Sequence, residues 1–206
     1  LAAAFVIALT ALPTFAQQRL IVIGGGKRPA EAMKRFVEWA GGEKARILVI
    51  TWASGEPDSS FKALKDSITD YKPASVEASP AKPLDAESRK KFLTQIASAT
   101  GVFFTGGDQN RIMDVLKDEE LLKLIRERYA AGVVMSGTSA GAAVMSDPMM
   151  TGEADLKKLD GSKVGVRAGL GLISDIIFDQ HFLVRQRHNR LFGLMMVRPG
   201  MLGIGI

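Results

Sequence analysis

The chain has 206 residues, of which 47% are hydrophobic and 24% charged, so it is long enough to bury a full core and predicts one globular domain. It has no cysteine, which excludes disulfides and zinc–thiolate sites, and its two histidines, His181 and His188, lack the spacing of a histidine metal motif. The net charge of +5 suits an anionic ligand, but no basic stripe with interleaved aromatic residues indicates nucleic-acid binding. We therefore expect no metal, no cofactor and no nucleic-acid partner.

The first 16 residues, LAAAFVIALTALPTFA, carry no charge, and their apolar stretch is too short to span a bilayer. Thr14 and Ala16 place small residues where a signal peptidase reads the chain. We interpret residues 1–16 as the remainder of a signal peptide cut before Gln17, which predicts a secreted or periplasmic protein. The alternative is an apolar helix that the mature chain keeps. No cysteine follows, so we expect no lipoprotein anchor.

Short apolar segments alternate with amphipathic segments as far as residue 145. Because the apolar segments lack a polar face, they are typical of a parallel sheet covered by helices on both sides. The sequence therefore predicts a doubly wound α/β fold. Strands are expected at 19–24, 46–51, 74–78, 101–105 and 132–136, and helices at 29–40, 59–71, 85–99, 109–116 and 119–130, with a further helix beginning at Ala140.

The pattern changes after Asp147. Residues 147–172 are rich in glycine and resemble a loop, and residues 175–181 resemble a strand. Residues 157–200 hold eight Lys or Arg against three Asp, which equals the net charge of the whole chain. Such a local positive field suits an anionic ligand, and a solvated basic face is the alternative.

Three glycine-rich turns, at 24–26, 106–108 and 137–141, follow expected strands. Ligands of doubly wound sheets bind beyond the carboxyl ends of the strands, so the turns are candidates for one site. The first turn is no phosphate loop, because Arg28 follows Lys27 where Ser or Thr is needed. Pro29 takes the place of the third glycine of a dinucleotide motif.

The third turn, Gly137-Thr-Ser-Ala-Gly141, has the G-x-S-x-G pattern of a nucleophile elbow. In such an elbow a sharp turn presents the serine Oγ, here that of Ser139, and the glycines remove clashing side chains. The helix that begins at Ala140 directs free amides at a developing oxyanion, and Gly107 can supply a second donor. The alternative is an ordinary turn between a strand and a helix.

A serine nucleophile needs a base, and His181 is the better of the two candidates. It ends an expected strand, within Phe178-Asp-Gln-His-Phe182, whereas His188 lies among arginines on an expected polar helix face. The alternative is that His181 is a buried core residue. Asp179, two residues earlier on the same strand face, could orient the imidazole.

Three motifs together resemble the cyanophycinase family of serine peptidases, which also contains aspartyl dipeptidase. The resemblance extends from about Leu20 to the end of the chain. It implies a flavodoxin-like, class I glutamine amidotransferase-like fold, and hydrolysis of β-aspartyl peptide bonds as in the Asp–Arg polymer cyanophycin, degraded to β-Asp-Arg dipeptides. The motifs are Phe104-Thr-Gly-Gly-Asp-Gln109, Gly137-Thr-Ser-Ala-Gly-Ala142 and Asp179-Gln-His-Phe-x-x-Arg185-x-Arg187-x-x-Arg190-Leu191.

The same resemblance implies roles for individual residues. A guanidinium can bind, through two hydrogen bonds, the carboxylate that a β-linked aspartyl unit leaves free. The alternative for Arg187 and Arg190 is structural pairing with Asp175 or Asp179. By position, Ser139 matches the nucleophile, His181 the base, and Gln109, Asp179, Arg185, Arg187 and Arg190 residues around the substrate pocket.

The triad acid of the family is a glutamate that follows a G-x-G-I-like strand. Here Gly203-Ile-Gly-Ile206 closes the sequence, and the expected Asp-Glu pair, which contains the acid, would occupy the next two positions. We therefore expect residues 17–206 to form a single hydrolytic domain that is incomplete at its C-terminus. Two other interpretations stay open: an aspartyl dipeptidase, and a non-catalytic binder of acidic peptides. The expected partner is a peptide rich in Asp and Arg, and the sequence leaves a homodimer open.

Overall fold

The computed structural model describes residues 16–206. The expected signal peptide at residues 1–16 therefore lies outside the described residues, except for Ala16. Between residues 16 and 206, no helix has both the length and the apolar character required to cross a membrane.

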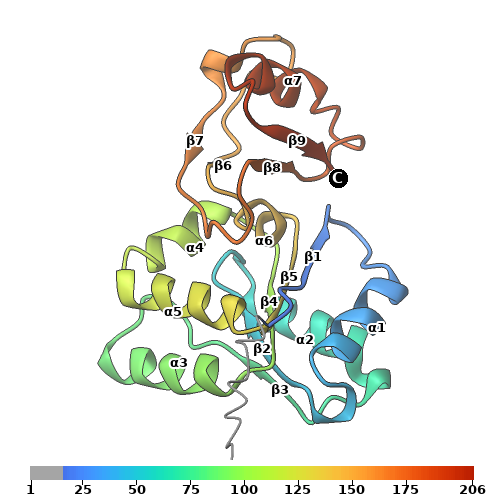
Figure 1. The fold of residues 1–206 in the computed structure, drawn as a ribbon, viewed down its shortest axis with the longest axis vertical. Helices are drawn as coiled ribbons and strands as arrows, with labels where there is room; N and C mark the ends of the chain where they lie inside the picture. Colours follow the sequence, from blue (N-terminus) through green and yellow to red (C-terminus); the bar gives the residue numbers. More distant parts are fainter. Residues whose placement is uncertain (1–15) are drawn as a thin grey trace, which may run out of the picture.

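A five-stranded parallel sheet lies at the centre of the molecule, with strand order β1-β5-β4-β2-β3 (Figure 1). Ile23 pairs with Thr138, and Phe104 pairs with Gly137, so β1, β4 and β5 end almost level with one another. This topology confirms the predicted doubly wound α/β fold. The strands are β1 (Leu20–Ile23), β2 (Arg46–Ile50), β3 (Ser75–Ala78), β4 (Gly101–Phe104) and β5 (Val134–Thr138).

Helices cover both faces of this sheet (Figure 1). Ile47 and Val49 of β2 pack into the apolar cluster on the face of α1 and α2, and Leu48 and Ile50 pack into the cluster on the other face. Burial on both faces explains why the strands have no polar side. The helices are α1 (Ala30–Trp39) and α2 (Pro57–Ile68) on the first face, and α3 (Ala86–Ser98), α4 (Gln109–Val115), α5 (Glu119–Ala130) and α6 (Ala140–Ala143) on the second.

Aspartates begin three of the helices, because their carboxylates accept hydrogen bonds from amides that have no partner within the helix. Asp85, the expected cap of α3, accepts from the Ser88 amide at 2.8 Å, and Asp118 caps α5 in the same way. The expected helix 59–71 is split in the structure. It consists of α2 and a 3₁₀ turn, η2 (Thr69–Tyr71); a similar turn, η1 (Gly42–Lys44), follows α1.

The chain after Asp147 forms a smaller layer beyond the carboxyl ends of the main strands (Figure 1). The expected loop 147–172 contains two strands and a 3₁₀ turn, which sequence reasoning missed because two-residue strands show no periodicity. The elements of this layer are β6 (Met149–Met150) paired with β7 (Val166–Arg167), η3 (Gly161–Lys163), β8 (Ile176–Asp179) paired in parallel with β9 (Leu202–Gly205), and α7 (His188–Val197).

This C-terminal layer has a small apolar cluster of its own, around Ile177, Leu191 and Leu194. The expected strand 175–181 ends early, at Asp179, because His181 has a φ of +52° and turns the chain back toward the main sheet.

Phe36 provides a test of the core. Its ring is fully buried on α1 and meets Phe103 of β4 edge to face, with ring centroids 5.7 Å apart. We expect Phe36→Ala to lower the free energy of unfolding by about 3–5 kcal/mol in urea denaturation, because it leaves a cavity. The matched control is Phe192→Ala on α7. The Phe192 side chain is 53% exposed, so this substitution should lower the free energy of unfolding by less than about 1 kcal/mol. Equal losses would contradict this core.

Candidate active site

Ser139 lies at the sharp turn between β5 and α6. Its backbone has φ +52° and ψ −113°, a conformation that residues with side chains rarely adopt. Two glycines make room for the turn: a Cβ on Gly137 would lie 2.2 Å from the Gly141 carbonyl oxygen, and one on Gly141 would lie 2.1 Å from that of Phe104. The Ser139 amide donates to the Ile23 carbonyl at 2.9 Å. The turn thus has the geometry of a nucleophile elbow.

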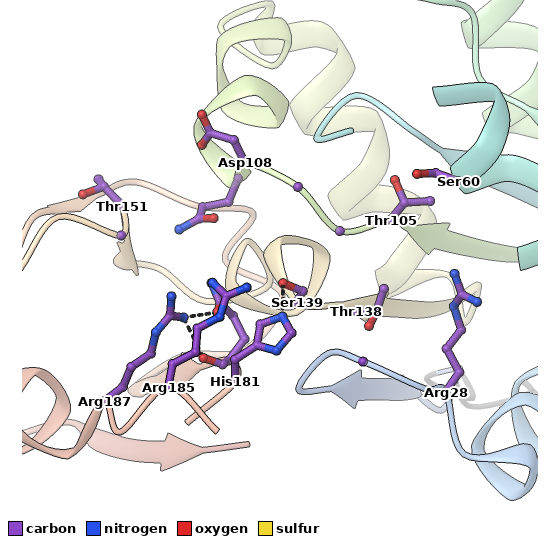
Figure 2. A pocket seen from close by; sticks show the side chains of 16 residues that line it. Arg28, Ser60, Thr105, Asp108, Thr138, Ser139, Thr151, His181, Arg185 and Arg187 are labelled. Atoms are coloured by element: carbon purple, nitrogen blue, oxygen red, sulfur yellow. Dashed lines mark hydrogen bonds between the residues drawn. The ribbon is translucent and has the colours of Figure 1, made fainter. Parts of the chain in front are cut away.

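His181 reaches Ser139 from the C-terminal layer. Its Nε2 lies 3.0 Å from Ser139 Oγ, the distance of a hydrogen bond (Figure 2). The His181 amide donates to the Gly24 carbonyl at 2.9 Å, so the end of β1 fixes the turn after β8. Gly25 lies against the imidazole, and a Cβ there would be 2.1 Å from His181 Cε1. His188 begins α7 and packs its ring against Phe182, away from the serine.

The surroundings of His181 keep the imidazole neutral. Burial lowers its pKa below the usual 6.5, and the positive charges of Arg185 and Arg187 lower it further. At pH 7 the ring is therefore predominantly unprotonated and able to accept the Ser139 proton.

Asp179 does not orient this imidazole. Its carboxylate is fully buried, and Oδ2 accepts from Arg190 Nε at 2.8 Å while Oδ1 binds Arg190 Nη2 and lies 3.9 Å from Arg187 Nη1. Both oxygens are thereby engaged by arginine. Arg190 is only 2% exposed, so the pairing with Asp179 that the sequence left as an alternative is the one the structure contains.

A pocket of about 530 Å³ lies over Ser139 (Figure 2). The charged residues that line it are three arginines, Arg28, Arg185 and Arg187, and one aspartate, Asp108. His181 also lines it but is neutral, so the pocket is positively charged. Gln109 also lines it, whereas Asp179 and Arg190 do not. The other lining residues are Gly26, Ser60, Thr105, Gly106, Gly107, Thr138, Ser139, Thr151, Gly152 and Gln180.

Three of these side chains extend the sequence-based site. In the sequence, Arg28 serves only to exclude a phosphate loop. Thr138 and Gln180 lie inside the motifs of the site, but the sequence assigns them no role. Their place in the pocket follows from strand register and from the turn after β8. A sequence pattern contains neither.

Two polar side chains of the pocket are held in place by the backbone of the C-terminal layer. Gln109 Nε2 donates to the Met150 carbonyl at 2.7 Å. Arg187 Nη1 donates to the Gln180 carbonyl at 2.7 Å and also contacts Gln180 Oε1. Burial, together with the charge of Arg190, lowers the pKa of Arg187 to about 10, so its guanidinium is still charged at pH 7.

The turn at Gly106 and Gly107 lies against the elbow. A Cβ on Gly106 would be 3.3 Å from Ser139 Cβ, and one on Gly107 would be 2.0 Å from the Ala53 carbonyl oxygen. Among residues 16–206, the amides of Gly107 and Ala140 have no hydrogen-bond acceptor. Over the same range, no three His, Asp or Glu side chains are grouped so that they could hold a metal ion.

The doubly wound sheet is of the class I glutamine amidotransferase-like type, and a serine on an elbow with a neutral histidine at hydrogen-bond distance is the arrangement typical of serine hydrolases. The model of peptidase family S51 matches residues 20–206. The chain therefore belongs to peptidase family S51.

Named relatives agree with this assignment. The chain is 34% identical to a cyanophycinase of Trichormus variabilis over 198 residues, which are 94% of this chain and 66% of the relative. It is 35% identical to a cyanophycinase of Geminocystis herdmanii over 201 residues, covering 93% and 72%. The chain thus spans about two thirds of the length of these relatives.

Two solved structures share the fold. A peptidase from an acI-B1 actinobacterium superposes with a TM-score of 0.67 at 23% identity, covering 91% of this chain and 79% of that structure. A putative peptidase E from Listeria monocytogenes gives 0.63 at 19% identity, covering 93% and 91%.

The contact between Gly25 and the imidazole yields a prediction. We expect Gly25→Ala to slow fluorophosphonate labelling of Ser139 at least a hundredfold, because the methyl group displaces His181. Gly26→Ala is the matched control: both glycines have positive φ, but a Cβ on Gly26 meets nothing within 4 Å. Equal labelling rates in the two variants, at equal thermal stability, would disprove this placement of His181.

The lowered pKa of His181 gives a second prediction. Labelling of Ser139 requires the neutral imidazole, so its rate should fall as the pH drops through the His181 pKa, below 6.5. Arg185→Gln removes a positive charge that disfavours protonation, so it should raise this pKa and move the acid limb to higher pH. Arg198→Gln, which removes the same charge outside the pocket, should leave the limb in place. A limb that does not move in Arg185→Gln would refute the electrostatic explanation.

Proposed function

We propose that this protein hydrolyses peptides that contain β-linked aspartyl units, with the Asp–Arg polymer cyanophycin as substrate and β-Asp-Arg as product. The observation that carries the proposal is the 3.0 Å contact between His181 Nε2 and Ser139 Oγ inside a pocket lined by Arg185 and Arg187. The names of the relatives support the same substrate.

In the proposed mechanism, Ser139 Oγ attacks the scissile carbonyl carbon while His181 Nε2 accepts the hydroxyl proton. The carbonyl oxygen becomes negative, and the free amides of Gly107 and Ala140 donate hydrogen bonds to it. The tetrahedral intermediate then collapses, and His181 returns the proton to the leaving amine. Water, activated by the same imidazole, releases the acyl group and restores Ser139.

The arginines suit a substrate of this kind. Each β-Asp-Arg unit keeps the carboxylate of its arginine, and a β-aspartyl dipeptide keeps its aspartyl α-carboxylate. Arg187 is held in advance by Gln180, and its Nε is buried without a hydrogen-bond partner in the described chain, which leaves a donor for an incoming carboxylate. We infer that the buried Asp179–Arg190 pair acts by positioning Arg187.

The family resemblance gives the triad acid a position shortly after Ile206, and the contacts of Ile206 support this part of the proposal. The Ile206 amide donates to the Asp179 carbonyl at 2.9 Å, and the Phe182 amide donates to the Ile206 carbonyl at 2.9 Å. The end of β9 therefore lies next to the turn that holds His181. A carboxylate that follows Ile206 within two positions could fix the orientation of the imidazole.

The experiment is a hydrolysis assay of the full-length protein on cyanophycin, with release of β-Asp-Arg as the readout. Ser139→Ala and His181→Ala should each reduce the rate by roughly 10⁴-fold, and the double variant should be no worse, because nucleophile and base act as one unit. His188→Ala should behave like the wild type.

The other outcomes separate the alternatives. Turnover of Asp dipeptides without turnover of the polymer would replace cyanophycin by a dipeptide substrate. A serine that no fluorophosphonate labels would indicate a non-catalytic binder of acidic peptides.

A further inference from the structure

Arg28 enters the active-site pocket from the side opposite Arg185 and Arg187. It follows the glycine turn at the end of β1, and Figure 2 shows it on one side of Ser139 with the two other arginines on the far side. Its guanidinium lies over the Phe103 ring, 5.9 Å from the centroid, and Nη1 donates to the Ala63 carbonyl at 3.2 Å. The side chain is therefore held, and does not extend freely into solvent.

The charge of Arg28 is not compensated. Among residues 16–206 it has no acidic partner, in contrast to Arg187 and Arg190, which share Asp179. Its Nε is buried and lacks a hydrogen-bond partner in the same range, and burial lowers the pKa of its guanidinium. A partly buried cation without a counter-ion destabilises the fold, unless a ligand supplies the negative charge.

Thr138 is a second, independent sign of a ligand at this place. It precedes the nucleophile on β5, lines the same pocket and is only 7% exposed. Its Oγ1 is buried and has no hydrogen-bond partner in the described structure. Figure 2 places Thr138 on the Arg28 side of Ser139. Buried hydroxyl groups nearly always have a partner, so an unsatisfied hydroxyl in a pocket indicates one that is brought by the ligand.

We propose that Arg28 and Thr138 form a second carboxylate subsite, so that the enzyme selects substrates with a free carboxylate on each side of the scissile bond. The inference rests on the proposed function, in which Arg185 and Arg187 bind the first carboxylate. Two consecutive β-Asp-Arg units meet this requirement, since each keeps the carboxylate of its arginine. The substrate is thereby fixed on both sides of Ser139, which places the scissile carbonyl over Oγ.

The test measures binding, so that it does not depend on turnover. The full-length Ser139→Ala protein is titrated calorimetrically with two linked β-Asp-Arg units, and with two derivatives in which one or the other arginine carboxylate is an amide. In this protein each amide should weaken binding about ten- to a hundredfold, as expected for loss of a hydrogen bond between charged groups.

Adding Arg28→Gln should weaken binding of the unmodified compound by a similar factor. For one of the two amides, however, it should change the dissociation constant less than twofold, because the carboxylate that Arg28 binds is already absent. Thr138→Val should weaken binding of the unmodified compound in the same selective way without lowering thermal stability. The matched control is Lys27→Gln, which removes an exposed positive charge one residue away and should leave all three constants unchanged.

Arg28 also packs on Phe103, so Arg28→Gln could reduce the folded fraction. Such a loss would affect all three ligands equally, whereas the proposal requires a difference between them within one variant. Arg28→Lys, which keeps the charge but not the planar donor pair, should show an intermediate difference.

Equal weakening of all three ligands, or none, would overturn the second subsite and leave the proposed function intact. Failure of the Ser139→Ala protein to bind any of the three would instead reject the proposed substrate, and this inference with it.

Discussion

The site depends on one constraint, the fit of the turn after β8 against the end of β1. The Gly24 carbonyl accepts the His181 amide, the Ile23 carbonyl accepts the Ser139 amide, and Gly25 leaves room for the imidazole. The end of β1 and the glycine turn after it thus position both Ser139 and His181. Any displacement of this strand would separate two atoms that must stay within hydrogen-bond distance, which explains why glycine occupies the contact.

Charge is organised around the same turn. The buried Asp179 carboxylate neutralises Arg190 and lies near Arg187, and this leaves the pocket itself with an excess of positive charge. Breaking a buried pair of this kind exposes an uncompensated charge to a poorly solvated interior. Burial lowers the pKa of His181, and the charges of Arg185 and Arg187, which line the same pocket, lower it further.

Much of this could be predicted from the sequence, and the exceptions have physical reasons. The parallel sheet follows from strands that are apolar on both faces, and the elbow and His181 follow from short motifs with strict local geometry. Arg190 could face either the pocket or Asp179, and the side from which α7 packs decides between them. The spacing of the arginines in the motif does not contain this information. The place of Arg28 in the pocket could not be predicted, because its partners, Phe103 and the Ala63 carbonyl, are distant in sequence.

Ser139 and His181 are separated by 42 positions along the chain and belong to different layers. Within residues 16–206 the five strands of the main sheet all precede Ser139, so on the ribosome this sheet can form while the segment from β8 onward is still unsynthesised or inside the exit tunnel. A nascent chain would then already contain the turn at Ser139, but its hydroxyl would have no imidazole beside it. Until the layer that holds His181 docks, Ser139 would thus lack the neighbouring imidazole that the folded protein places beside it.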